Sequence, residues 1–493
     1  MASQPIIVVG GGLAGLSASL EILNRGGRVI IVEGEANTGG NSAKASSGIN
    51  GAGTATQAAL GIDDNPENLI KDTLTAGDEE NDRELVKILA ESSSDAVEFL
   101  KKVGVDLGDV NLCGGHSVPR THWIPSPKEG RPIPAGFEIM RRLRLRLDEL
   151  KAKDEASIQF LTKTKMIGIE TDSNGRVVGV KTESVDTKEV RIVNGLAVIL
   201  ATGGFSADHE DDSLLVEFGR QKLGFPTTNG QFAKGHGVKI ARALGAQLIL
   251  MDRIQIHPTA FVDPKEPTAG TMFLAAEALR GKGAILINSE GKRFGNELGR
   301  RDYLTKRILE HASPIKEEFQ NGSGGRHAAI MLMNEANVDS FGRPAFNFYS
   351  IVKKFFTKYN NADELAEKLG VDPKVIRNEL DDYKDHFDGK SADRFGKTVF
   401  PVSPIVADET IYAAIVTPAI HYTMGGLRID GNAQVIGANE KPIRGLLAAG
   451  EVTGGVHGSN RLAGNSLLEC VVFGRIAGET AIKLAAAGIE REL

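Results

Sequence analysis

The chain has 493 residues, a length that predicts two domains rather than one. Its 41% hydrophobic and 25% charged residues are the proportions of a soluble globular protein. The net charge of -6 argues against a nucleic-acid partner, because phosphate binding needs clustered Lys and Arg. With only Cys113 and Cys470, the sequence excludes a disulfide framework and cysteine-ligated iron–sulfur clusters, and we expect no metal site.

The first residues, MASQPIIVVGGG, lead directly into an apolar strand. They contain neither the basic segment nor the apolar stretch of a secretory signal. We therefore expect a cytoplasmic protein, or alternatively a mitochondrial one whose presequence has been removed. No apolar run approaches the roughly 18 residues that a membrane-spanning helix needs, so we expect no membrane span.

The first elements predict a β-α-β unit that binds a dinucleotide. Residues 5–9 are a short apolar strand, residues 10–26 a glycine turn opening a helix, and residues 28–33 a second strand. The turn matches the G-x-G-x-x-G pattern with Gly10, Gly11, Gly12, Leu13, Ala14 and Gly15. Glycines let the backbone approach a pyrophosphate, the helix N-terminus attracts its charge, and Glu33 would accept from a ribose hydroxyl.

Two further glycine-rich segments favour FAD over NAD as that dinucleotide. Small residues dominate positions 34–51, after Glu33, and the apolar strand predicted over 195–204 ends in ATGG. Both segments suit a long cofactor that needs extensive contact with the backbone. The sequence has no second strand–GxGxxG–helix unit, so no separate NAD(P)H site is evident.

Later segments complete the predicted organisation. A hairpin is expected over 427–436, and a long amphipathic helix follows near the end of the chain. Residues 252–422 differ in composition from the rest of the chain, with Lys-rich and acidic helical stretches. We therefore predict an α/β domain formed by residues 1–251 and 423–493, with residues 252–422 inserted as a capping domain.

Several longer motifs carry a resemblance to a known family. They are GGNSAKASSGING, GGHSVPRTHW, IQIHPTAF, AAEALRGKGAILIN, RFGNELGRRD, IHYTMGG and LLAAGEVTGGVHGSNRLAGNSLLECVVFGR. Together they resemble the flavoprotein family of succinate dehydrogenases and fumarate reductases, in its soluble, fungal-type fumarate reductase branch. The resemblance spans essentially the whole chain. It implies an α/β fold with a Rossmann-like FAD-binding domain and an inserted α+β capping domain.

The resemblance also implies which residues hold FAD, in addition to residues 10–15 and Glu33. One group is Gly39, Gly40, Asn41, Ser42, Lys44, Ala45, Ser46, Ser47 and Gly48. A second group is Ala201, Thr202, Gly203, Gly204, Gly450, Glu451, Asn465, Ser466, Leu467 and Leu468. A helix that begins near Asn465 would stabilise negative charge on the reduced ring. Membrane-bound relatives attach FAD to a His after the GG run, but the first His here is His116, so non-covalent FAD is expected.

The same resemblance implies an oxidoreductase that would reduce fumarate to succinate with a hydride from reduced FAD. His421 and Arg461 would hold one carboxylate and His257 the other. Such donors suit this task, because Arg offers a planar, bidentate face to a carboxylate. Electrons would come from an external donor such as reduced flavin, since no haem, cluster or NADH motif is evident.

The proton donor implied by the resemblance is Arg301, with Glu277 and Arg280 as the relay that restores its proton. An arginine is a weak acid, with a pKa above about 12, so it needs both a strongly basic substrate carbon and such a relay. The adjacent Arg300 is the less favoured candidate for the donor.

Two alternatives stay open at this point. The substrate could be another α,β-unsaturated acid, such as urocanate or an aryl acrylate, or the chain could be a non-enzymatic flavin-binding protein. Three carboxylate-binding side chains argue for a dicarboxylate, and the complete relay argues for an enzyme.

Two departures from the family pattern bear on the sites. Ala276 replaces a Thr that assists carboxylate binding, and His236 replaces an Asp that contacts the cofactor.

Overall fold

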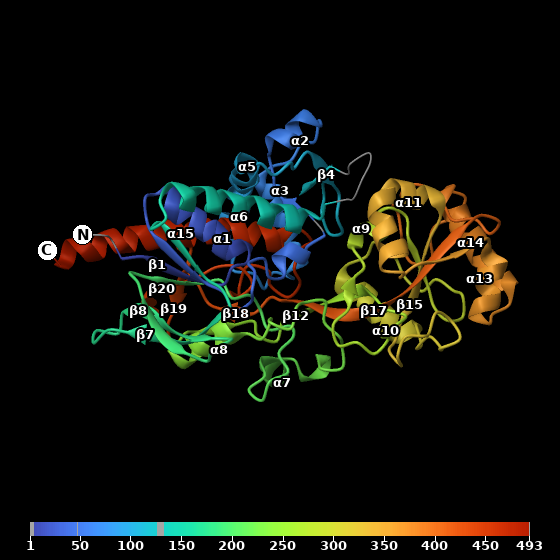
Figure 1. The fold of residues 1–493 in the computed structure, drawn as a ribbon. Coiled ribbons are helices and arrows are strands. Elements are labelled where there is room, and N and C mark those ends of the chain that lie inside the picture. Colours follow the sequence, from blue (N-terminus) through green and yellow to red (C-terminus); the bar gives the residue numbers. More distant parts are fainter. Residues whose placement is uncertain (1–3, 47, 126–132, 493) are drawn as a thin grey trace.

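A computed structural model describes residues 4–46, 48–125 and 133–492 of the chain, with side chains described up to residue 486. The fold is mixed α/β, as predicted, and it forms two lobes that lie side by side in Figure 1. One lobe holds a parallel sheet and both chain ends. The other holds an antiparallel sheet.

The parallel sheet runs in the order β19-β20-β10-β1-β2-β6. Its strands are β1 (Ile6–Val9), β2 (Val29–Val32), β6 (Ile158–Leu161), β10 (Val198–Leu200), β19 (Gln434–Ile436) and β20 (Pro442–Ala448). All pairs are parallel except β19 with β20. The short central strands are apolar and buried, as expected for a parallel sheet covered on both faces. The predicted Rossmann-like organisation is confirmed.

Two long helices pack together over this sheet. They are α1 (Leu13–Asn24), which follows β1, and α15 (Asn465–Glu492), which ends the chain; α6 (Ala135–Lys153) also contacts α1. Glycines allow the close approach of α15 to α1. A Cβ atom on Gly474 or Gly478 would lie 2.6 Å from the carbonyl oxygen of Ala14 or Ala18, respectively. The two ends of the chain are thereby joined in one lobe.

The second lobe is built around an antiparallel sheet in the order β13-β12-β17-β15-β14, with β16 also paired to β17. Its strands are β12 (Ile254–Phe261), β13 (Phe273–Leu274), β14 (Ile285–Ile287), β15 (Ala329–Met333), β16 (Thr357–Tyr359) and β17 (Ile411–Thr423). Two hydrophobic clusters, both drawn from residues 260–419, fill the lobe. The long strands β12 and β17 extend from it toward the parallel sheet (Figure 1).

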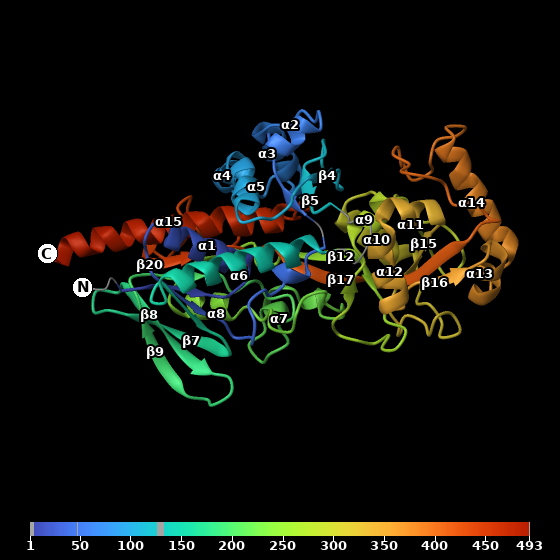
Figure 2. The ribbon, with the colours of Figure 1, turned by 45° about the horizontal axis from the view of Figure 1, so that its top comes forward.

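Smaller elements surround these two sheets. The remaining strands are β3 (Ile49–Asn50), β4 (Asp109–Asn111), β5 (Thr121–Trp123), β7 (Thr164–Thr171), β8 (Val177–Ser184), β9 (Val190–Asn194), β11 (Leu248–Ile249) and β18 (Gly426–Leu427). The remaining α-helices are α2 (Ala55–Ala59), α3 (Pro66–Ala76), α4 (Arg83–Glu91), α5 (Ser93–Lys102), α7 (Leu214–Phe218), α8 (His236–Ala243), α9 (Glu277–Gly281), α10 (Arg301–His311), α11 (Glu335–Phe341), α12 (Arg343–Asn347), α13 (Ala362–Leu369) and α14 (Pro373–Phe387). Figure 2 shows the β7-β8-β9 sheet projecting from the first lobe, away from the second. Among the described residues, none of the helices has the length and apolar character needed to cross a bilayer.

The contact between α1 and α15 generates a test of stability. Gly478→Ala should lower the free energy of unfolding by about 1–3 kcal/mol, because the added methyl group overlaps a backbone oxygen that cannot rotate away. The thermal unfolding midpoint measures this effect. Gly281→Ala in α9 is the matched control, since a Cβ there meets no atom within 4 Å. Equal midpoints for the two variants would contradict the close packing of the helices.

Candidate active site

The turn after β1 is shaped for a group that approaches its backbone. Gly10 has a φ of +107°, and a Cβ atom on it would lie 2.2 Å from the carbonyl oxygen of Ala201. A Cβ atom on Gly15 would lie 1.9 Å from the carbonyl oxygen of Gly10. Only glycine fits either position, so the turn lies flat against β10 and opens directly into α1.

The carboxylate of Glu33 lies beneath this turn. Its oxygens accept hydrogen bonds from the N–H of Gly11 at 2.7 Å and from the N–H of Glu35 at 2.8 Å. Burial raises the pKa of Glu33, and the two N–H donors oppose that rise. The carboxylate is therefore fixed in place at the end of β2, where an acceptor for a ribose hydroxyl was predicted.

The predicted cofactor segment at residues 39–48 crosses the same turn. Gly39 donates its N–H to the carbonyl of Gly11 at 2.9 Å, and the hydroxyl of Ser42 accepts from the first N–H of α1 at 3.2 Å. The hydroxyl of Ser46 is buried without a hydrogen-bond partner among the described residues. Ser47, also predicted to contact the cofactor, lies outside the described residues.

The other predicted cofactor residues follow the carboxyl ends of the neighbouring strands. Residues 201–204 follow β10, and Gly450 and Glu451 follow β20. The hydroxyl of Thr202 is buried and lacks a partner in the described part of the chain. Ligands of open α/β sheets bind at this edge of the sheet. The glycine cradle and the orphaned hydroxyls together fit a long dinucleotide such as FAD.

Glu451 is an unusual acid within this group. Its Oε1 accepts from the N–H of Thr423 at 3.0 Å and from the hydroxyl of Thr423 at 3.2 Å. Burial raises its pKa to about 7, although these two hydrogen bonds act in the opposite direction. Glu451 therefore changes charge near neutral pH.

Two histidines of the second lobe come together on the paired strands β12 and β17, in the first half of β12 and near the end of β17. The rings of His257 and His421 are 5.2 Å apart and meet edge to face. Burial lowers the pKa of both imidazoles well below 6.5, and the charge of Arg301 lowers it further. The Nε2 atom of His257 is buried with no hydrogen-bond partner among the described residues. Both side chains are therefore neutral near pH 7.

Arg301 begins α10 and is 8% exposed. Its Nε and Nη2 both donate to one carboxylate oxygen of Glu277, at 3.1 and 3.0 Å, and its Nη1 donates to Gln255 at 2.8 Å. The other oxygen of Glu277 accepts from the N–H of Gly114 at 3.0 Å. Burial opposes ionisation of Glu277, but the charges of Arg301 and Arg280 outweigh it and lower its pKa to about 2.

Arg280 lies three residues after Glu277, and the segment is helical as the predicted relay requires. Its Nη1 donates to the carbonyl of Glu297 at 2.6 Å. Its Nε and Nη2 are buried without partners in the described structure. Two donors of a buried cation are thus free to bind another group.

Arg461 is the third buried guanidinium. It is 3% exposed, lies 4.5 Å from the centre of the Tyr422 ring, and keeps a free Nε within the described structure. Burial, followed by the charge of Arg301, lowers its pKa to about 10, so it stays a cation at neutral pH. The ring beneath it is held in turn, since the hydroxyl of Tyr422 donates to Glu469 at 2.5 Å.

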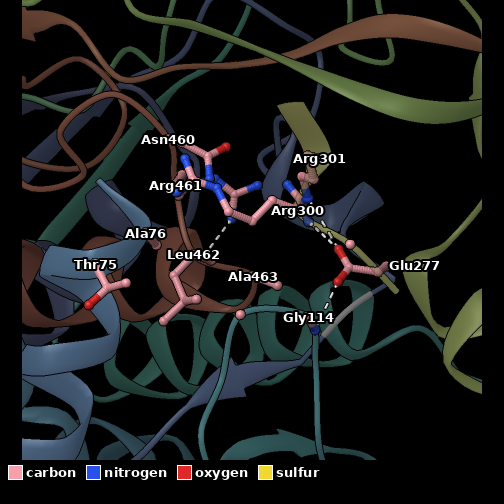
Figure 3. Close-up of a pocket in the computed structure, with 12 residues that line it drawn as sticks. Thr75, Ala76, Gly114, Glu277, Arg300, Arg301, Asn460, Arg461, Leu462 and Ala463 are labelled. Carbon is pink, nitrogen blue, oxygen red and sulfur yellow. Dashed lines mark hydrogen bonds and ion pairs between the residues drawn. The ribbon is translucent and has the colours of Figure 1, made fainter. Parts of the chain in front are cut away.

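A pocket between the two lobes is lined by three of these groups, and Arg280, His257 and His421 are not among its lining residues. Its lining includes Glu277 and Arg301 from the second lobe and Arg461 from the loop before α15. Figure 3 shows Glu277 hydrogen-bonded to both Arg301 and Gly114 at one side of the pocket. The pocket therefore carries more positive than negative charge, which favours an anionic ligand.

Arg300 and Arg301 have different partners although they are adjacent. Arg300 forms a bidentate pair with Asp78 at 2.9 and 3.0 Å, and both side chains are partly exposed. Asp78 also accepts from the hydroxyl of Ser459, just before the Arg461 segment. This ion pair ties the two lobes together at the edge of the pocket.

Four other histidines bind protein groups. His116 contacts the carbonyl of Ala463 at 2.9 Å, His122 contacts Thr54 at 2.8 Å, and His457 contacts Glu469 at 2.6 Å. His236, which departs from the family pattern, pairs with Glu210 at 3.3 Å. Glu210 belongs to a cluster of three carboxylates with Asp208 and Asp212, but Lys239 lies within 3.6 Å of all three.

Three residues that contact the site were not identified from the sequence. Gln255 joins the two sides of the pocket, because its amide accepts from Arg301 and donates to the carbonyl of Arg461 at 3.0 Å. Its position two residues before His257, on the same face of a strand, could have indicated it. The neighbouring sequence did not indicate the contact of the Gly114 N–H with Glu277 or that of the Thr228 hydroxyl with His421, at 2.7 Å.

Comparison with known proteins identifies the class. The family described as "FAD binding domain" matches residues 5–467. The chain is 38% identical to a fumarate reductase of Schizosaccharomyces pombe, over 96% of this chain and 88% of that protein. It is also 38% identical to fumarate reductase 1 of Saccharomyces cerevisiae, over 97% and 99%. In structure it resembles the open conformation of a flavocytochrome c3 fumarate reductase, with a TM-score of 0.75 and 33% identity over 98% of this chain and 78% of the other.

Fold, cofactor cradle and these relatives define an FAD-dependent oxidoreductase. The chain belongs to the FAD-binding fumarate reductase family. The resemblance inferred from its motifs is thereby confirmed, whereas the role of each site residue stays a prediction.

The buried acid Glu451 generates a prediction for stability against pH. Its folded pKa, about 7, lies above its ordinary value of 4.5, so the folded state holds a proton that the unfolded state releases between these two pH values. The native protein therefore loses stability as pH rises from about 4.5 to 7. Glu451→Gln cannot ionise, so relative to the native protein it should gain up to about 3 kcal/mol across this range.

Denaturant unfolding at pH 5 and pH 8 measures this difference. Glu67→Gln, at an exposed position in the first turn of α3, is the control and should show no such gain. A Glu451→Gln advantage that is the same at both pH values would refute the raised pKa.

Proposed function

We propose that this protein reduces fumarate to succinate, using a proton from Arg301. The observation that carries the proposal is the buried pair of Arg301 with ionised Glu277, in a pocket that also contains Arg461. The carboxylate stabilises the cationic form of Arg301, so an arginine that has given up its proton is driven to regain one. A second arginine in the same pocket can bind the substrate.

The clamp on the substrate would consist of three side chains. Arg461 and His421 hold one carboxylate, and His257 holds the other. The free Nε of Arg461 and the free Nε2 of His257 among the described residues support these roles, because each is a buried polar atom that still needs a partner. Holding both carboxylates draws electron density away from the double bond and stabilises negative charge on one of its carbons.

Proton transfer would then follow a fixed order. Arg301 gives a proton to the developing carbanion and becomes neutral. The ionised Glu277 then takes a proton from the free Nε or Nη2 of Arg280, three residues along the same helix, and passes it to Arg301. Arg280 regains its proton from solvent water. The relay keeps Arg301 charged between turnovers, which matters because burying a neutral arginine beside an ionised Glu277 leaves that carboxylate without its partner.

FAD, bound without a covalent link, would supply the hydride. The segment 39–48 supports non-covalent binding, since it contains no histidine or cysteine that could form the bond. Residues 10–15 and 201–204 would hold the cofactor through their backbones, and the N-terminus of α15 would stabilise negative charge beside it. An external donor such as reduced flavin, and a cytoplasmic location, remain predictions.

The substrate class can be tested directly. Anaerobic addition of fumarate to chemically reduced holoenzyme should reoxidise the flavin rapidly and yield one succinate per flavin, because the three proposed clamp side chains offer donors for two carboxylates. Flavin absorbance and product analysis measure the outcome. Faster reoxidation by urocanate or cinnamate would replace fumarate with a monocarboxylate substrate. No reoxidation by any of the three acids would overturn the enzymatic proposal.

The proton donor can be tested by a matched pair of variants. Arg301→Ala should lower the turnover of fumarate by at least about 10³-fold while the yellow flavin stays bound, since only the proton step is lost. Arg300→Ala removes a partly exposed guanidinium and should keep turnover within a few-fold of the native value. If Arg300→Ala were the inactive variant, the donor would be misassigned.

A further inference from the structure

His421 has only one N–H to offer. Burial, together with the cations of Arg301 and Arg461, keeps its pKa well below 6.5. A neutral imidazole carries its proton on either Nδ1 or Nε2, and the nitrogen without the proton is an acceptor. A carboxylate is acceptor-only, so the wrong tautomer of His421 would repel it.

The Nδ1 atom of His421 is already engaged by the protein. The hydroxyl of Thr228 lies 2.7 Å from it, whereas the carbonyl of Ile420, the competing acceptor for that hydroxyl, is 3.4 Å away. No hydrogen bond reaches Nε2 within the described part of the chain. A hydroxyl that donates to Nδ1 leaves the single ring proton on Nε2.

Backbone hydrogen bonds fix the position of Thr228. Its N–H donates to the carbonyl of Ile420 at 2.9 Å, and the N–H of Ile420 donates to the carbonyl of Pro226 at 2.8 Å. The next side chain, Asn229, donates to the carbonyl of His421 at 2.8 Å. The hydroxyl is therefore held against the end of β17 before any ligand arrives.

We propose that Thr228 is a positioning residue that selects the Nε2–H tautomer of His421. Its hydroxyl donates to Nδ1, and the ring proton at Nε2 is then available to hydrogen-bond a substrate carboxylate. Such selection by the partner of the second ring nitrogen is a general way in which proteins set histidine tautomers. The identity of the ligand as a dicarboxylate rests on the proposed function, but the tautomer itself does not.

The first test reads the tautomer without any substrate. Holoenzyme with 15N-labelled histidine has ten histidines, and the His421 signals are assigned by their loss in His421→Gln. Long-range 1H–15N spectra should show a protonated Nε2 and an unprotonated Nδ1 at His421. Thr228→Ser should keep this pattern, and Thr228→Val should shift it toward a mixture of tautomers. A protonated Nδ1 in the native protein, or an unchanged pattern in Thr228→Val, would overturn the proposal.

The second test measures the consequence for substrate. Thr228→Val should lower kcat/KM for fumarate about tenfold, mostly through KM, and Thr228→Ser should stay within threefold of the native protein. In a His421→Ala background, Thr228→Val should have no further effect, because the group it positions is gone. A full tenfold loss in that background would assign Thr228 a role that does not pass through His421.

Thr227→Val separates positioning from folding. Thr227 lies on the same segment, but its hydroxyl donates to the carbonyl of Ile420 at 3.2 Å rather than to His421. It should leave the tautomer and kcat/KM near the native values, and losses equal to those of Thr228→Val would mean that the segment acts only as a structural support. Native enzyme that does not reduce fumarate would refute the proposed function, while the spectra would still decide the tautomer.

Discussion

Burial of three arginines in the candidate active site is the constraint on which the rest of the site depends. Arg280, Arg301 and Arg461 are each 8% exposed or less, and Glu277 is the carboxylate that pairs with Arg301. Removing such cations from water is costly unless anions or hydrogen bonds replace the lost hydration. The excess of positive charge lowers the pKa of Glu277, and it adds to the effect of burial in lowering the pKa of His421. The protein is thus assembled around a place for an anion.

The parallel sheet solves a different problem, which is to bring distant parts of the chain to one edge. The turn after β1, the end of β10 and the end of β20 meet there, although they are separated by about 190 and 250 residues of sequence. Glycines in α15 let this last helix lie against α1, so its first turn reaches the same edge. The predicted cofactor residues come from both ends of the chain for this reason.

Local sequence patterns predicted much of this arrangement, but they did not predict the long-range contacts. The G-x-G-x-x-G turn, the acid at Glu33 and the helical spacing of Glu277 and Arg280 are short-range features, and each could be recognised from neighbouring residues. The contact of Gly114 with Glu277 spans 163 positions, and that of Thr228 with His421 spans 193. Neither residue type is distinctive, so only the folded chain reveals these partners. Arg300 and Arg301 likewise have different partners because of the direction in which α10 begins, and the sequence alone does not reveal this direction.

Arg300 and Arg301 are adjacent in sequence, but the ion pair of Arg300 lies at the protein surface and that of Arg301 is largely buried. The pair of Arg300 with Asp78 is 35% and 52% exposed, whereas that of Arg301 with Glu277 is 9% and 17% exposed. At physiological ionic strength, dissolved ions screen exposed charges with a Debye length of about 8 Å, but they act weakly on buried ion pairs. A rise in salt concentration therefore weakens the Arg300–Asp78 ion pair, which joins the two lobes at the edge of the pocket, and leaves the buried Arg301–Glu277 pair intact. Ionic strength can thus change access to the pocket without changing the chemistry inside it.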